Sequence, residues 1–435
     1  MSRLRAIAGF RAWNALRHRN YRLFWSGQLV SVIGTWMQSV AQGWLVLLLT
    51  NDPFMLGLVA AAQFAPVMVF GLFGGLIADY LPKRRTLIAT QAVQMCLAFV
   101  LAGLTATGLV EVWHVFVLAF LLGCSNAFDM PARQSFVVEM VGRADVANAV
   151  GLNSAIFNGA RIIGPAIAGL AIGAVGIAAC FVLNGFSFLA VIGGLLLIRE
   201  DELLPTPLLP RPTSVRGVVD NLAEGLAYVR RTPIVLLGVT VVGLVATFGM
   251  NFNVVVPAMA RDVLGVGAPG FGFLLSALGL GSLTSALAIA VMGRPRIGAI
   301  VGGAILLGSL EVVFSISRSF PLSLLCAYGM GAGAIAMAAT ANAAIQTAVP
   351  DHLRGRVMSV YTTVFAGSTP IGGPLAGGLA SAFGVAQAVA VGGAISALVG
   401  LGGLAWVRRR GLTNVAPPIV VPRAVAPGPV ASNRP

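Results

Sequence analysis

Three ionisable side chains lie inside long apolar stretches of the chain: Asp129, Arg161 and Glu311. Charges in the hydrocarbon core of a membrane are costly, and they mark proton relays, ion pathways or sites for charged ligands. Arg161 lies about 14 residues into its stretch, roughly 21 Å along a helix, and therefore near the middle of a bilayer. Its guanidinium needs a carboxylate, a polar cavity or an anionic ligand.

The two carboxyl groups are candidates for proton coupling. Asp129 stands in Phe128-Asp129-Met130-Pro131-Ala132-Arg133-Gln134-Ser135, and its candidate partners are Arg133, four residues on, and Arg161 across the helix pair. Glu311 is in the ninth apolar stretch, where it either takes part in coupling or only faces a neighbouring helix. We therefore expect Asp129, Arg161 and Glu311 to couple protons to transport.

Polar residues follow one face of the first apolar stretch. They step by three and four residues, which is helical spacing: Gln28, Ser31, Thr35, Gln38 and Gln42. Such a face lines either a watery cavity or a helix interface, and the bulky amides favour the cavity. We expect substrate contacts from this face and from Trp36, Asn158, Thr247, Asn251 and Asn253. Trp44 is expected in the interfacial aromatic belt.

A charged loop between two apolar stretches supplies a further candidate, Gly75-Leu76-Ile77-Ala78-Asp79-Tyr80-Leu81-Pro82-Lys83-Arg84-Arg85. Basic loops of this kind anchor a chain on the cytoplasmic side. Asp79 is different, because a carboxylate is costly at the end of a hydrophobic helix. The spacing predicts a charge latch in which Asp79 meets cations.

The composition identifies the elements that hold these groups. The chain has 435 residues, of which 57% are hydrophobic and 10% charged, whereas soluble domains have about 25% charged residues. It is therefore predicted to be an all-helical protein that crosses the membrane several times. The net charge of +14 would suggest nucleic acid in a soluble protein, but the positions of the charges exclude that partner.

Twelve apolar runs have the length of about 20 residues that crosses a bilayer. They lie at approximately 23–49, 54–79, 87–107, 113–138, 147–174, 177–198, 233–260, 269–292, 297–317, 320–348, 355–382 and 384–407. We expect an amphipathic segment at 1–22, a six-helix bundle at 23–198, a linker at 199–232, a second bundle at 233–407 and a disordered tail at 408–435. Within the linker, Val218, Leu222, Leu226 and Val229 have helical spacing and predict a surface helix.

The cations give the orientation. All 28 Lys and Arg residues except Arg161, Arg261 and Arg318 fall on the face that holds both termini. Such asymmetry places both termini in the cytoplasm and the chain in the cytoplasmic membrane, surrounded by lipid.

The two halves repeat one feature at equivalent places. Gly164-Pro165 in the fifth run corresponds to Gly373-Pro374 in the eleventh, 209 positions apart by the numbering. A Gly-Pro pair removes a backbone hydrogen bond and permits bending, while small residues allow close helix approach. We therefore expect helix bending at Gly164, Pro165, Gly373 and Pro374, or ordinary small-residue packing.

These motifs resemble the major facilitator superfamily. The loop is similar to its signature Gly-x-x-x-Asp-(Arg/Lys)-x-Gly-(Arg/Lys)-(Arg/Lys), with matches at Gly75, Asp79, Lys83 and Arg84 and departures at Tyr80 and Pro82. Asp-x-Pro-Ala-Arg-Gln-Ser at 129–135 and Gln38-x-x-x-Gln42-x-Trp44 resemble the branch with the enterobactin exporter and drug-efflux proteins, and the likeness covers residues 15 to about 407. The Gly164-Pro165 segment looks like the antiporter motif of that superfamily, but no arginine stands in the middle of the fourth helix.

The resemblance implies export of a siderophore-like metabolite or drug by alternating access and proton antiport. Asp79 would then face Arg133 and the basic start of the eleventh helix at Arg354 and Arg356, and would close the cytoplasmic side. Protonation of Asp129 would weaken its pairing with Arg161. An uptake carrier for a small organic solute and a non-transporting sensor or scaffold are the alternatives.

The sequence does not contain the residue patterns typical of enzymes or of ATP-driven pumps. His18, His114 and His352 are scattered, no carboxylates are paired, and no P-loop is present, which argues against an enzyme or an ATP-driven pump. The four cysteines lie in separate apolar runs without metal-ligand spacing. We therefore expect no metal and no cofactor, and a monomer that binds a small molecule and protons.

Overall fold

The structure is a computed structural model that describes residues 13–80, 82–204, 215–292 and 296–412; side chains are described for all of these except 71–80 and 215–221. The described residues are nearly all helical. The predictions for residues 1–12 and 413–435 and for the side chain of Asp79 lie outside the described residues.

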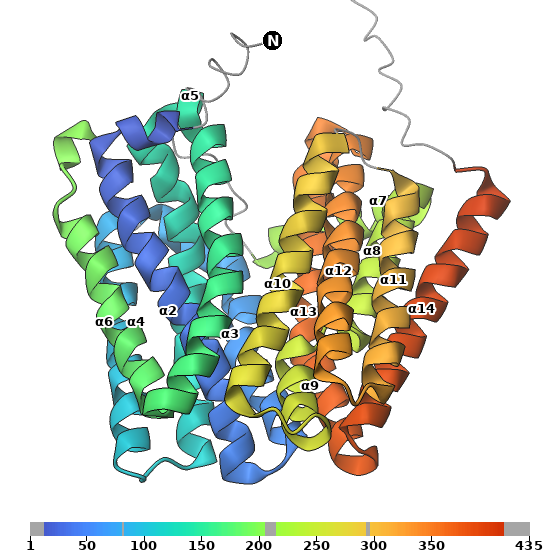
Figure 1. Ribbon diagram of the computed structural model, residues 1–435. Coiled ribbons are helices and arrows are strands. Elements are labelled where there is room, and N and C mark those ends of the chain that lie inside the picture. Colours follow the sequence, from blue (N-terminus) through green and yellow to red (C-terminus); the bar gives the residue numbers. More distant parts are fainter. Residues whose placement is uncertain (1–12, 81, 205–214, 293–295, 413–435) are drawn as a thin grey trace, which may run out of the picture.

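The first half of the chain forms one bundle, drawn from blue to green in Figure 1. Its long helices are rich in apolar residues, which lets each of them cross a hydrocarbon core. Its elements are η1 (Asn14–Arg17), α2 (Arg19–Thr50), α3 (Pro53–Tyr80), α4 (Lys83–Ala106), α5 (Val112–Val175), α6 (Ile177–Leu196) and η2 (Glu200–Glu202).

The second half forms the other bundle, drawn from yellow-green to red. Its elements are α7 (Val215–Arg231), α8 (Pro233–Phe248), α9 (Phe252–Ala258), η3 (Met259–Val263), α10 (Gly267–Met292), α11 (Ile297–Ile316), α12 (Phe320–Ala348), α13 (Asp351–Phe383) and α14 (Val385–Arg410). The helix α7 covers the segment in which the spacing predicts an amphipathic helix, and Val229 on it is buried.

Twelve crossings follow from these helices. Ten helical segments of the described chain are long and apolar enough to span a membrane. One of them, α5, has 64 residues, about 96 Å of helix against a core of about 30 Å, and thus supplies two crossings. It turns back at Gly142, whose φ of 70° suits glycine. The remaining crossing is α13, whose first turns carry Asp351, Arg354 and Arg356.

One expected span is interrupted. The run at 233–260 was expected to be a single helix, but α8 ends at Phe248 and α9 begins at Phe252. Gly249, Met250 and Asn251 lie between them outside helical structure. This interruption is called the α8–α9 break below.

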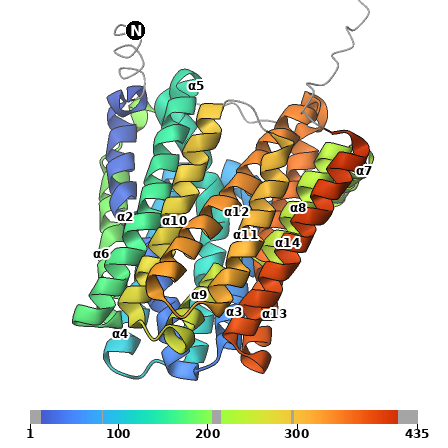
Figure 2. The ribbon, with the colours of Figure 1, turned by 45° about the vertical axis from the view of Figure 1, so that its right-hand side comes forward.

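The two bundles meet along two helix pairs. Figures 1 and 2 show α10 alongside α5 and α13 alongside α3. We call the end of the molecule with Asn14 and Arg410 the termini end, and the end with Asn51, Gly176 and Gly384 the far end. The ribbons of the halves spread apart toward the termini end and come together toward the far end (Figure 1).

The Gly-Pro pairs lie in these contacts. A Cβ added to Gly272 of α10 would lie 2.3 Å from the carbonyl oxygen of Pro165, and one added to Gly57 of α3 would lie 2.3 Å from that of Gly373. Both α5 and α13 continue as helices through their prolines. The glycines therefore let the backbones of the two halves approach each other, and bending at the prolines stays a prediction.

Candidate functional site

A cavity of about 130 Å³ lies between the two halves. Its walls come from α2, α5, α10 and the chain around the α8–α9 break. They combine one cation, one amide and apolar or aromatic surface: Trp36, Arg161, Pro165, Met250, Phe252, Asn253, Leu275 and Leu278. This is the usual composition of a small-molecule site, in which a few polar groups orient a mostly apolar ligand.

Arg161 is the charged group of this cavity. Its guanidinium carbon lies 5.8 Å from the centre of the Trp36 ring, a cation–π distance. Phe157 packs against the same indole with ring centres 5.8 Å apart, which holds it in place. Among the described residues Arg161 forms no ion pair, so its charge is free to attract an anionic group.

Asp129 pairs with a different arginine. Its Oδ2 accepts a hydrogen bond of 3.0 Å from Arg133 Nε, and the two residues form an ion pair. Its Oδ1 accepts hydrogen bonds of 2.8 Å from Thr90 and Gln91 of α4. Of the two partners considered from the sequence, the structure therefore selects Arg133, because an i,i+4 partner on the same helix is within reach. The expected pairing with Arg161 is wrong for this conformation.

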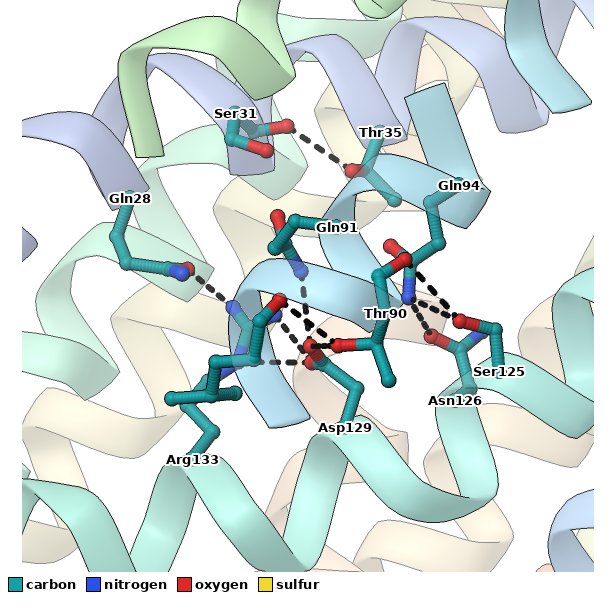
Figure 3. Close-up of polar contacts among 11 residues, drawn as sticks. Gln28, Ser31, Thr35, Thr90, Gln91, Gln94, Ser125, Asn126, Asp129 and Arg133 are labelled. Atoms are coloured by element: carbon teal, nitrogen blue, oxygen red, sulfur yellow. Dashed lines mark hydrogen bonds and ion pairs between the residues drawn. The ribbon is translucent and has the colours of Figure 1, made fainter. Parts of the chain in front are cut away.

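This network joins three helices, as Figure 3 shows. Arg133 also donates to the side-chain oxygen of Gln28 on α2. Beside it, Gln94 of α4 donates to Ser125 and Asn126 of α5 at 3.3 and 3.2 Å. A carboxylate with donors on both oxygens is well stabilised in a buried place. The network therefore holds α2, α4 and α5 together.

The polar face of α2 divides among several neighbours. Gln28 contacts Arg133, Gln38 accepts a hydrogen bond of 2.6 Å from Asn184 of α6, and Gln42 donates to Gln63 of α3 at 3.4 Å. The side chains of Gln28, Gln38 and Gln42 are buried. They occupy helix interfaces in this conformation, the alternative that the spacing left open. Thr35 is exposed and bonds to the carbonyl of Ser31.

Other expected cavity residues bond to backbone. Asn158 donates to the carbonyl of Ser154 one turn earlier. Asn251 donates to the carbonyl of Thr247 at 2.7 Å, which bridges the end of α8 to the start of α9. Of the expected residues, Trp36 and Asn253 do line the cavity.

Trp44 also differs from expectation. It is buried, and its ring stacks on Phe271 of α10 with centres 5.9 Å apart. An interfacial belt residue would face headgroups, so the expected position is wrong. The ring instead packs across the contact between the halves.

The cations of the predicted latch are paired within their own halves. Lys83 pairs with Glu139, and Arg84 pairs with Glu200 while donating to the carbonyls of Leu195 and Leu196 at the end of α6. In the second half the pairs are Arg354 with Asp351 and Arg356 with Glu224. With Arg133 on Asp129, these cations are engaged away from the other half.

At the far end the halves are bonded to each other. Arg261, after α9, donates to the carbonyl of Leu47 near the end of α2 at 2.7 Å. Nearer the middle of the molecule, Ser276 of α10 donates to the carbonyl of Ile162 in α5 at 2.6 Å. Direct hydrogen bonds thus join the halves at the far end and near the middle of the molecule.

Glu311 is buried in α11 at 2% exposure. Its side chain lies beside the α8–α9 break, since a Cβ added to Gly249 would be 3.0 Å from its Oε2. It faces neighbouring helices, and its part in proton coupling stays a prediction. No group of three or more His, Cys, Asp or Glu with metal-binding geometry occurs among the described residues.

The sequence reasoning missed the α4 side of the Asp129 network. Thr90, Gln91 and Gln94 stand at i, i+1 and i+4 of an apolar run, which is a polar stripe of the same kind as that on α2. The same criterion, applied to the third run, would have found them.

Comparisons with known proteins agree with this architecture. The family model described as transmembrane secretion effector matches residues 10–425. The multidrug efflux pump Tap of Mycolicibacterium fortuitum is 32% identical over 370 residues, which cover 82% of this chain and 88% of that protein. The staphyloferrin A transporter of Staphylococcus aureus is 23% identical, and the match covers 85% of this chain and 92% of that protein.

Solved structures support the fold. A POT family transporter in complex with a thioalcohol conjugated peptide superposes with a TM-score of 0.72 at 12% identity, covering 90% of this chain and 96% of that one. A bacterial homolog of the human lysosomal transporter Spinster superposes with a TM-score of 0.66 at 13% identity, and the match covers 89% of this chain and 95% of that one. At such identities the likeness concerns the fold, here the two six-helix bundles of the superfamily. The chain therefore belongs to the transmembrane secretion effector family, a family of multi-pass transporters within the major facilitator superfamily.

Proposed function

We propose that this protein exports small organic molecules across the cytoplasmic membrane by alternating access, driven by proton antiport. The observation that carries the proposal is the cavity between the halves, in which Arg161 lies over Trp36 without a carboxylate partner among the described residues. The relatives named for multidrug efflux and for staphyloferrin A support the substrate range of drugs or siderophores.

The positive charge distribution supports a cytoplasmic termini end. Because Arg261 joins the halves at the far end and Ser276 joins them near the middle of the molecule, the conformation described here then corresponds to a state that is open or opening toward the cytoplasm. In the opposite state Arg133, Arg354 and Arg356 would leave their partners and approach Asp79, closing the termini end.

The cavity selects for a particular ligand chemistry. Trp36, Met250 and Phe252 offer an aromatic and adaptable apolar surface, and Arg161 offers a positive charge. We propose aromatic or amphiphilic compounds with an anionic group as the preferred substrates.

Asp129 and Glu311 are the buried carboxyl groups available for protons. Protonation of Asp129 would release Arg133, which would free this cation for the latch. The Asp129 network is therefore the proposed link between protons and the termini end.

The test uses inverted membrane vesicles with a pH gradient followed by a fluorescent amine. Addition of 2,3-dihydroxybenzoate should dissipate the gradient, whereas its uncharged amide, 2,3-dihydroxybenzamide, should do so weakly. In Arg161→Gln the preference for the carboxylate should fall roughly 10- to 100-fold, because a hydrogen bond to a charged group contributes about 1.5–3 kcal/mol. Equal responses to both compounds in the unmodified protein would contradict the anionic substrate class. Accumulation against the export direction would indicate the uptake alternative, and no transport at all would indicate a sensor.

A further inference from the structure

A carboxyl group without a partner lies deep in the second half. Glu311 is 2% exposed, and among the described residues its Oε2 has no hydrogen-bond partner. It lies roughly 7.5 Å before the end of α11 at Ile316, at 1.5 Å per residue. An isolated carboxylate in such surroundings costs so much free energy that the group takes up a proton instead.

The elements that pack against α11 bring no cation to this depth in the described chain. The helix α8 has no charged residue, and the arginines of α14 stand in its last turn at the opposite end of the molecule. The titratable and charged groups on or next to these elements are Cys326 and Tyr328 of α12, Arg408, Arg409 and Arg410 of α14, Arg318 beyond α11, and the mutually paired Arg261 and Asp262. Protonation is therefore the available way to neutralise Glu311.

The carboxyl group and a hydroxyl point at the same place. A Cβ added to Gly249 would lie 3.0 Å from Glu311 Oε2 and 2.3 Å from Ser396 Oγ. Ser396 donates its proton to the carbonyl of Gly392 at 2.8 Å, which leaves the hydroxyl oxygen able to accept. Both side chains thus converge on the α8–α9 break.

The same break reaches the cavity and the contact between the halves. Met250 of the break and Phe252 and Asn253 at the start of α9 line the cavity. Further along, Arg261 donates to the carbonyl of Leu47 in the first half. A change in packing at Gly249 is therefore connected through one short segment to the substrate and to the far-end contact.

We propose that Glu311, Ser396 and the α8–α9 break form a proton-binding site that couples proton movement to the cavity. The inference rests on the proposed proton antiport and adds a second site to the Asp129 network. With a proton bound, the neutral carboxyl group packs against α8 and α14. When the proton leaves to water, the carboxylate requires hydration, so the break separates from α11 and shifts the cavity wall and the Arg261 contact. No other reactant is consumed.

The first measurement concerns the proton itself. The full chain in lipid nanodiscs is studied by infrared difference spectroscopy between acidic and alkaline buffer, in which a protonated carboxyl group has its own carbonyl stretching band. We expect this band in the unmodified protein, its loss in Glu311→Gln, its retention in Glu311→Asp, and a shifted titration in Ser396→Ala. Glu202→Gln, which removes an exposed carboxylate of η2, is the matched control and should leave the band unchanged. A band that survives in Glu311→Gln overturns the proposal.

The second measurement separates coupling from transport. Proteoliposomes are assayed for 2,3-dihydroxybenzoate accumulation driven by a pH gradient and for exchange of labelled against unlabelled compound without a gradient. We expect Glu311→Gln to lose at least tenfold of the driven accumulation and to keep exchange within twofold. Undiminished driven accumulation in this variant overturns the coupling role.

The two measurements keep the proposals apart. If the unmodified protein shows no accumulation driven by the gradient, the proposed antiport fails, whereas the infrared band still decides whether Glu311 binds a proton. If driven accumulation is present and survives Glu311→Gln, the antiport stands and this inference falls.

Discussion

Asp129 and Glu311 are two carboxyl groups of equal burial, each 2% exposed, yet their surroundings are opposite. Asp129 receives hydrogen bonds from Thr90 and Gln91 and pairs with Arg133. Glu311 has one oxygen without a partner among the described residues and no neighbouring cation at its depth. Burial alone therefore does not assign a role to a carboxyl group in a membrane, because the hydrogen-bond donors and cations around it differ from one buried site to another.

The comparison also separates the two halves. In the first half the polar groups hold three helices together, whereas in the second half the polar group lies beside an interrupted helix. We therefore expect substitutions at Asp129 to lower stability as well as coupling, and substitutions at Glu311 to lower coupling with little change in stability. The following predictions test this contrast, from the largest expected effect to the smallest.

The largest effect is expected from Asp129→Ala. Removal of one partner of a buried ion pair leaves Arg133 uncompensated and should lower the free energy of unfolding by about 3–5 kcal/mol. Denaturant unfolding in mixed micelles measures this change, and both driven transport and exchange should fall together. If the unfolding free energy stays unchanged while driven transport is lost, the Asp129 network does not hold the helices together, and the contrast in stability between the two sites disappears. Glu202→Gln serves as the control with an unchanged midpoint.

A smaller loss is expected from Thr90→Val, which removes one of the donors to Asp129 with little change of shape. A hydrogen bond to a charged group contributes about 1.5–3 kcal/mol, and the unfolding free energy should fall by that amount. The same micelle experiment measures it. No loss would mean that the hydrogen bond from Thr90 to Asp129 does not stabilise the fold.

Gly249→Ala tests the space beside Glu311. The added methyl group would meet Ser396 Oγ and Glu311 Oε2, and overpacking of this kind costs about 1–3 kcal/mol. Driven transport should fall with it. Gly302→Ala on α11 is the matched control, since its Cβ meets nothing within 4 Å; it should stabilise the helix by about 0.5–1 kcal/mol. Equal stability and equal driven transport of the two variants would show that the α8–α9 break accommodates an added methyl group.

The smallest effect on stability is expected from Glu311→Gln. A neutral carboxyl group and an amide have similar shape and both lack charge, so the unfolding free energy should change by less than about 1 kcal/mol. A loss comparable to that of Asp129→Ala would mean that Glu311 is ionised and paired, which removes the contrast between the two sites.

The fold could be predicted from the sequence because run length and charge asymmetry are strong signals for membrane helices. The twelve crossings followed from them, whereas the resemblance to the superfamily rested on the loop motif from Gly75 to Arg84 and on the segment at 129–135. The α8–α9 break was not predicted, because glycine is frequent in membrane helices and a single asparagine such as Asn251 does not by itself interrupt one. The turn of α5 at Gly142, by contrast, falls between the predicted runs 113–138 and 147–174.

The site was predicted in part. Asp129, Arg161 and Glu311 were found by their charge, and Arg133 was one of the two partners considered for Asp129. The contact with Arg133 follows from i,i+4 spacing, whereas a contact with Arg161 depends on how the two parts of α5 on either side of Gly142 are rotated, which a single sequence does not give. The glutamines of α2 illustrate the same difficulty, because helical spacing gives a common face but does not say whether water or another helix covers it. Gln38 faces Asn184 of α6 for this reason.

The stack of Trp44 on Phe271 places an indole in the contact between the halves, which would separate in the outward-open state of the proposed cycle. Its fluorescence emission should then shift toward longer wavelength as the ring exchanges an aromatic neighbour for solvent or lipid headgroups. In a variant in which Trp44 is the only tryptophan, its own fluorescence would report the separation of the two halves without an attached dye.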